Sequence, residues 1–182
     1  VGSQNNLGGS ENVFIGSESG GGTWATGASD GNTAVGWNTM KGAMNGAGLN
    51  TAVGKNALLA LTEGDRNVTI GADAGKAITS ANRNTAIGYQ ALYSEDADGD
   101  RTIAIGHQAL YSQNGDTEAM GNTAVGYISG FYNVTGTNNT YMGYGSGGSG
   151  AGSTNSHSNN TGIGYKALEG VAIVKKTLEI IE

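Results

Sequence analysis

One short phrase recurs along the whole chain, and this repetition constrains the fold more than any other feature. The phrase begins with Asn or Thr and ends in an aliphatic residue followed by glycine. Nine copies lie at residues 12–16, 32–36, 50–54, 67–71, 84–88, 102–106, 122–126, 139–143 and 160–164. Their glycines are 20, 18, 17, 17, 18, 20, 17 and 21 residues apart. Short, nearly contiguous units of this kind are typical of a β-solenoid, in which each unit forms one coil.

Alignment of the copies gives columns of constant residue type. Every copy ends in a glycine: Gly16, Gly36, Gly54, Gly71, Gly88, Gly106, Gly126, Gly143 and Gly164. The residue before it is always aliphatic: Ile15, Val35, Val53, Ile70, Ile87, Ile105, Val125, Met142 and Ile163. Most of these side chains are β-branched, which favours a strand, so we predict that this column points into a core. The position two residues earlier, on the same face, holds Thr, Val or Ile, and a mostly small residue separates the two.

The fold predicted from these columns is all-β, a parallel β-solenoid (β-roll) of about nine to ten short coils over residues 1–168. The third residue after each glycine is small and the next is Leu, Met or Gly, which predicts a second short strand in every coil. Coils stacked about 4.8 Å apart would pair each strand with its neighbours. The Asn of each phrase would cap a turn or form a ladder of side chains. A meander of hairpins is the alternative, but hairpins would not require the same residue in each column.

Association with other chains is expected because the core columns are thin. Val, Ile, Ala and Leu fill them with few aromatic residues, so apolar burial barely offsets the entropy of ordering the chain. Residues 169–182 form a separate C-terminal segment. A series of apolar residues begins just before this segment and continues to its end, with spacings of 4, 3, 4 and 3: Ala167, Val171, Val174, Leu178 and Ile181. This spacing predicts a short helix that begins a coiled coil; a capping helix or a pair of strands also fits.

Composition excludes several classes of function. The formal net charge is −6 and there is no arginine-rich stretch, so nucleic acid is not an expected partner. No apolar run approaches the roughly 20 residues of a membrane span, so no membrane insertion is expected. The absence of cysteine excludes disulfides and thiolate metal sites. Because the chain begins at Val1 without a signal peptide, we interpret it as a segment of a longer protein.

The repeated phrases resemble a known family. NTAVG and NTAIG, each followed by a small residue three positions on, resemble the head repeats of YadA-like trimeric autotransporter adhesins. The longer phrase NTAIGYQALYS, at residues 84–94, is similar to repeats of bacteriophage tail-fibre and receptor-binding proteins. The resemblance implies a homotrimer of intertwined or packed β-rolls followed by a coiled coil. It also implies an extracellular location, on a virion tail fibre or a bacterial cell surface. The coils are longer and less even than the adhesin repeat.

Receptor contacts are predicted at the position after the glycine, where large amphipathic side chains vary, and in the insertions between coils. The candidates are Trp24, Trp37, Tyr89, His107, Tyr127, Tyr144 and Tyr165. Aromatic side chains there could stack on sugar rings of a cell-surface glycan, or contact a protein receptor. The alternative is an aromatic ladder that only stabilises the solenoid.

Chemistry beyond binding finds little support in the sequence. Residues 95–100, EDADGD, hold four carboxylates, but Arg101 and His107 stand where a calcium loop needs Gly and Glu, so we interpret them as a solvated acidic turn. The two histidines and the carboxylates form no catalytic pattern, so we expect no enzyme, cofactor or metal site. The predicted function is therefore structural, with host or receptor attachment by a trimeric fibre. The alternatives are a self-assembling filament without a receptor, or an ice-binding solenoid with a column of threonines.

Overall fold

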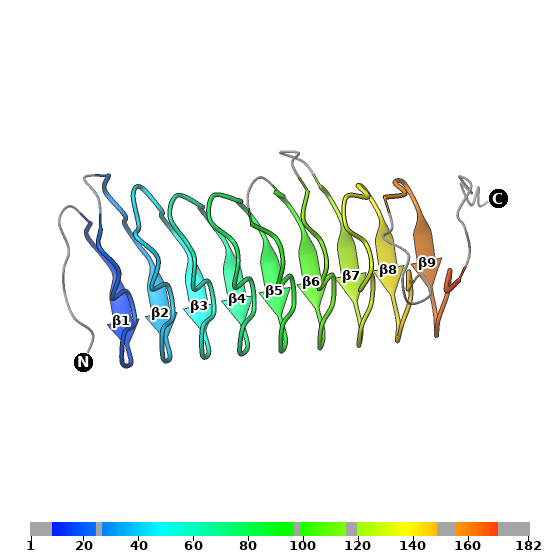
Figure 1. Ribbon diagram of the computed structural model, residues 1–182, viewed down its shortest axis with the longest axis horizontal. Coiled ribbons are helices and arrows are strands. Elements are labelled where there is room, and N and C mark those ends of the chain that lie inside the picture. Colours follow the sequence, from blue (N-terminus) through cyan, green and yellow to red (C-terminus); the bar gives the residue numbers. More distant parts are fainter. Residues whose placement is uncertain (1–8, 25–26, 97–98, 116–119, 149–155, 171–182) are drawn as a thin grey trace.

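The computed structural model describes residues 9–24, 27–96, 99–115, 120–148 and 156–170. Its strands are β1 (Val13–Ile15), β2 (Thr33–Val35), β3 (Thr51–Val53), β4 (Val68–Ile70), β5 (Thr85–Ile87), β6 (Ile103–Ile105), β7 (Thr123–Val125), β8 (Thr140–Met142) and β9 (Thr161–Ile163). They form one parallel sheet in sequence order, with β1 and β9 at opposite ends of the row (Figure 1). The predicted parallel β-solenoid is confirmed, with about eight turns.

Each coil contains one strand, not the two predicted. After the anchor glycine the chain forms turns, because the second and fourth residues adopt left-handed backbone angles. In the second coil these are Asn38 and Met40, with φ of 55° and 48°. A strand cannot continue through such residues, which reverse the chain direction. No helix occurs in the described ranges, and the predicted C-terminal helix at 169–182 lies almost entirely outside them.

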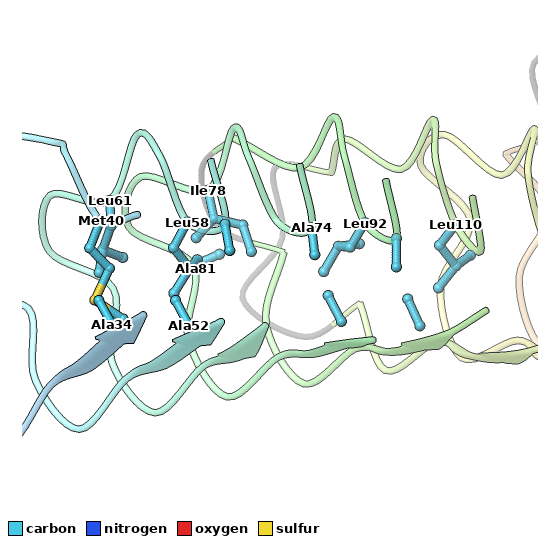
Figure 2. Packing of buried hydrophobic residues seen from close by; sticks show 14 of the residues in the cluster. Ala34, Met40, Ala52, Leu58, Leu61, Ala74, Ile78, Ala81, Leu92 and Leu110 are labelled. Carbon is cyan, nitrogen blue, oxygen red and sulfur yellow. The ribbon is translucent and has the colours of Figure 1, made fainter. Parts of the chain in front are cut away.

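The prediction that the aliphatic column forms the core is wrong. The small residue in the middle of each strand points inward, and its aliphatic neighbours point outward. Ala52 and Ala86 are fully buried, whereas Ile15 and Ile70 are 57% and 40% exposed. The interior of each coil is narrow, and in the coils of β2, β3, β5 and β6 a large residue from the turn already fills it. In Figure 2 the alanines of the strands face Met40, Leu58 and other large residues of this kind.

Side-chain size is balanced across each narrow coil. Four coils pair Ala in the strand with Leu or Met four residues after the anchor glycine, as in Ala52 and Leu58. Where the strand residue is large, that turn position is glycine. A Cβ atom on Gly20 would lie 2.9 Å from the ring of Phe14, and one on Gly147 would lie 2.4 Å from the ring of Tyr141. In coils with such a pair, one large side chain from either the strand or the turn fills the interior.

The anchor glycines are required by close contact between coils. Gly88 has φ of +129°, and a Cβ atom there would lie 2.4 Å from the carbonyl oxygen of Gly106 in the next coil. Both the backbone angle and the contact exclude other residues. The same contact recurs at successive anchor glycines, which explains why this column of the repeat never varies.

A buried ladder of asparagines joins the coils, as one of the two sequence interpretations predicts. Asn67 Nδ2 donates to Asn50 Oδ1 (3.1 Å) and to the carbonyl of Ala81 (2.8 Å), and its Oδ1 accepts from the backbone N–H of Asn84 (3.0 Å). These bonds satisfy backbone groups at the corner before each strand. The ladder is interrupted at the sixth coil, where Thr102 replaces asparagine.

Candidate interaction surface

The outward face of the sheet is an uncharged, largely apolar surface that runs the length of the solenoid. Two residues of every strand contribute to it, and none of them is charged. The large apolar residues most exposed here are Val13, Ile15, Val53, Ile70, Ile103, Met142 and Ile163, at 37–65%. With strands about 4.8 Å apart, this face is roughly 40 Å long. Contiguous apolar surfaces of this extent mark interaction sites in soluble proteins.

A row of aromatic side chains follows the C-terminal ends of the strands. The rings of this row lie 5.0–5.4 Å apart between centroids; Tyr89 is tilted by 36° against His107, and the rings from His107 through Tyr127 and Tyr144 to Tyr165 are stacked. Nearer the N-terminus, Trp37 is 49% exposed and carries the Lys55 ammonium 5.0 Å from its ring centroid. Six of the seven predicted contact residues therefore share one side of the molecule.

Stacking changes what this aromatic row can offer to a ligand. The rings between Tyr89 and Tyr165 have a neighbouring ring on both faces, so they present edges and polar atoms outward. Tyr127, for example, lies 5.0 Å from His107 and 5.0 Å from Tyr144. Stacking on a sugar requires an open ring face, whereas hydrogen bonding to phenol oxygens does not. The ladder that the sequence offered as an alternative is therefore present.

Trp24, the seventh predicted contact residue, is buried. Only 6% of it is exposed, its Nε1–H donates to the carbonyl of Gly20 (3.1 Å), and its ring meets Phe14 edge-on at 5.5 Å. The indole closes the core of the first coil, where glycine at position 20 leaves space. A surface contact at Trp24 is therefore excluded in this conformation.

Sequence reasoning missed a row of arginines. Arg66, Arg83 and Arg101, the only arginines of the chain, occupy one column in three successive coils, two residues before β4, β5 and β6. All three are exposed. Arg66 lies 3.9 Å from Asp65 and Arg83 lies 3.6 Å from Asp100, longer than charge-assisted hydrogen bonds. The sequence signal that could have found this row is that each arginine directly precedes the position of the asparagine ladder, which holds Asn67, Asn84 and Thr102.

A second row, also unpredicted, lies in the turns. Tyr93, Tyr111 and Phe131 stack in parallel at centroid distances of 4.9 Å. Lys76 extends this row, with its ammonium 5.3 Å from the ring centroid of Tyr93. These rings are half-buried, so their contribution is stacking between coils.

The acidic turn at 95–100 is not the fully solvated turn expected. Glu95 is completely buried, and it accepts hydrogen bonds from Gln113 Nε2 (3.1 Å) and the backbone N–H of Gly99 (3.2 Å). Burial raises the pKa of Glu95 to about 7, although these donors oppose the shift. Gln113 also donates to Thr102 Oγ1 and accepts from Asn122, so Glu95 and Gln113 bridge the interruption of the asparagine ladder.

Other tests of function give little. Among the described residues, no group of three or more His, Cys, Asp or Glu is placed to hold a metal ion. Nor does the described part of the chain contain an apolar helix of membrane-spanning length. Comparisons with protein-family models, curated proteins and solved structures give no match to this chain. The fold and its surfaces therefore carry the functional argument.

Proposed function

We propose that this chain is a structural and attachment segment of a trimeric extracellular fibre, of the phage tail-fibre or bacterial-adhesin type. The observation that carries the proposal is the uncharged outward face of the nine-stranded sheet. Three copies whose sheets face a common axis would remove this surface from water and add the apolar burial that the narrow coils lack. Each copy contributes the same face, as a cyclic homo-oligomer requires.

Two features of the sequence support a parallel arrangement. The repeat resembles heads of trimeric fibres, and the apolar spacing that begins at Ala167 and Val171 is that of a coiled coil. Parallel copies would bring these segments together at one end of the assembly. An antiparallel arrangement would separate them by the length of the solenoid.

Attachment to a receptor is the second part of the proposal. In a trimer closed on the sheet faces, the turns carrying Tyr93 and Tyr111 would face outward. The exposed phenols of Tyr127, Tyr144 and Tyr165 would lie at the border of the interface, 45–74% exposed in a single chain. Phenol hydroxyls both donate and accept hydrogen bonds, which suits a glycan or a polar protein surface.

Ice binding is a second candidate, favoured by one observation. Thr33 and Thr51 are paired in register on the outward face, as are Thr140 and Thr161, and the neighbouring outward column carries methyl groups. A regular array of hydroxyl and methyl groups on one sheet could order water. This function needs the same face to be open to solvent, so it excludes the trimer.

The oligomeric state decides between these functions. Sedimentation of the full chain at micromolar concentration should give a single species of three times the chain mass, 18.2 kDa. A monomer with thermal hysteresis would establish the ice-binding alternative, and open fibres in electron microscopy would establish a filament subunit. A glycan array probed with the trimer should then show binding that a Tyr127→Ala, Tyr144→Ala variant loses.

A further inference from the structure

We propose that the arginine row of one copy docks on the aromatic row of its neighbour, so that the two borders of the sheet form the lateral contacts of the assembly. This inference rests on the proposed self-association and adds its chemistry. Arg66, Arg83 and Arg101 line the border before the strands, and Tyr89, His107 and Tyr127 line the border after them.

Symmetry brings these two borders together. When parallel sheets face a common rotation axis, the border after the strands in one copy lies beside the border before the strands in the next. This holds for a parallel dimer and for a trimer. In an antiparallel dimer whose twofold axis runs along the strands, each border would meet the same border of the other copy. The arginines of one copy would then face the arginines of the other.

The arginine row and the aromatic row also overlap in their positions along the solenoid. The coils of β4, β5 and β6 carry the arginines, and the aromatic row starts in the coil of β5. The preceding position in that row is Ala72, a small residue in a column of large ones. Tyr89 therefore has His107 as a ring neighbour on one side, tilted by 36°, and a small Ala72 in place of a ring at the preceding position of the row.

The space beside Ala72 suits a guanidinium from the neighbouring copy. In a level assembly, Arg66 of the neighbour is in the same coil as Ala72 and would stack on the open face of Tyr89. Lys55 does not compete, because its ammonium lies over Trp37, on the far side from Tyr89. Arg83 and Arg101 of the neighbour would donate hydrogen bonds to the phenol oxygen of Tyr89 and to the imidazole of His107.

The long distances from Arg66 and Arg83 to their own carboxylates fit this role. At 3.9 and 3.6 Å these pairs leave the N–H donors without close carboxylate bonds. A partner aromatic would engage the same guanidinium groups while the carboxylates keep their charge balanced.

A photocross-linking experiment tests the contact directly. Tyr89 is replaced by p-benzoyl-phenylalanine in the 182-residue chain. Unlabelled and ¹⁵N-labelled chains are mixed so that they assemble together, and the sample is then irradiated and digested. Cross-links between differently labelled chains should fall on the peptide that contains Arg66 or Arg83. Cross-links to the partner's own residues 89–107, or to another face, would overturn this inference while leaving an oligomer in place.

A second measurement uses matched charge variants. Arg66→Gln with Arg83→Gln should raise the dissociation constant of the assembly at least tenfold, whereas Lys41→Gln, which removes a cation on another side of the coil, should leave it unchanged. Equal constants for both variants would overturn the inference. A wild-type chain that sediments only as a monomer would remove the proposed function itself, so the two failures are distinguishable.

Discussion

The two faces of the sheet are made by alternate residues of the same three-residue strands, yet they follow different rules. On the inward face residue size varies, and the two large aromatic residues are compensated by glycine in the same coil, Phe14 by Gly20 and Tyr141 by Gly147. On the outward face the residues stay aliphatic or Thr, and within the part of the chain that the structure describes they are half-exposed or exposed. The inward face is thus specified by packing within one chain, whereas no such packing within the described residues accounts for the apolar outward face.

A substitution that disturbs the balance of side-chain size inside a coil should have the largest effect on stability. Tyr141→Ala should lower the free energy of unfolding by about 3–5 kcal/mol, because it empties the eighth coil. Leu at position 147 should recover part of this loss, since Leu58 and Leu92 occupy that column opposite Ala with similar left-handed backbone angles. Urea unfolding of the Tyr141→Ala variant, with and without Gly147→Leu, measures this recovery. Gly147→Leu alone should lower the free energy of unfolding, because the new side chain would clash with the Tyr141 ring.

Glu95 should make stability depend on pH. Its folded pKa of about 7 exceeds the unfolded value near 4.5, so the folded chain holds the proton more tightly. Stability should therefore be greatest below pH 4.5 and fall by up to about 3 kcal/mol as pH rises to 7. Glu95→Gln should remove this slope in unfolding measured from pH 4 to 8. A slope that survives the substitution would assign the effect to another group.

The asparagine ladder should contribute less per residue. Asn67→Ala should lower the free energy of unfolding by about 1–3 kcal/mol, because it leaves the carbonyl of Ala81 and the N–H of Asn84 without their side-chain partners. The exposed Asn114, changed to Ala, serves as the control and should alter the unfolding free energy by less than about 0.5 kcal/mol. Equal losses for the two variants would show that the ladder bonds add nothing.

The smallest effect on the single chain is expected on the outward face. Ile70→Glu should change the unfolding free energy of the dissociated chain by no more than about 0.5 kcal/mol, because Ile70 is already 40% exposed. The same change should abolish self-association, since it places one carboxylate from each copy at the interface. Lys41→Gln, which lowers the net charge by the same one unit elsewhere, should associate like wild type; dissociation of both variants would assign the effect to net charge.

The sequence predicts the solenoid well because the repeat spacing, the invariant glycines and the strand column each reflect one backbone requirement. It did not predict which strand face points inward, since a period of two defines two faces without ranking them. Ala86 points inward and Ile87 outward because Leu92 from the turn already fills the coil. This packing joins two different columns of the repeat, so it cannot be read from either column alone. The pairing of Phe14 with Gly20 and of Tyr141 with Gly147 was a readable signal of that packing.

The candidate surfaces were predicted in part. A fixed offset from the anchor glycine placed Tyr89, Tyr127 and Tyr144 in one row, because every coil repeats the same backbone path. Trp24 lies in an insertion outside that register, so its burial depended on tertiary packing against Phe14. The arginine row was overlooked because its members are 17 and 18 residues apart, and a search for local basic clusters cannot find them.

Sedimentation equilibrium of the full chain, from well below to well above micromolar concentration, tests the central claim most directly. The outward face predicts reversible association to a trimer at neutral pH, and Ile70→Glu should remain monomeric at every concentration. A wild-type chain that stays monomeric throughout, with its outward face open to water, would contradict the claim that this face is an interface between copies.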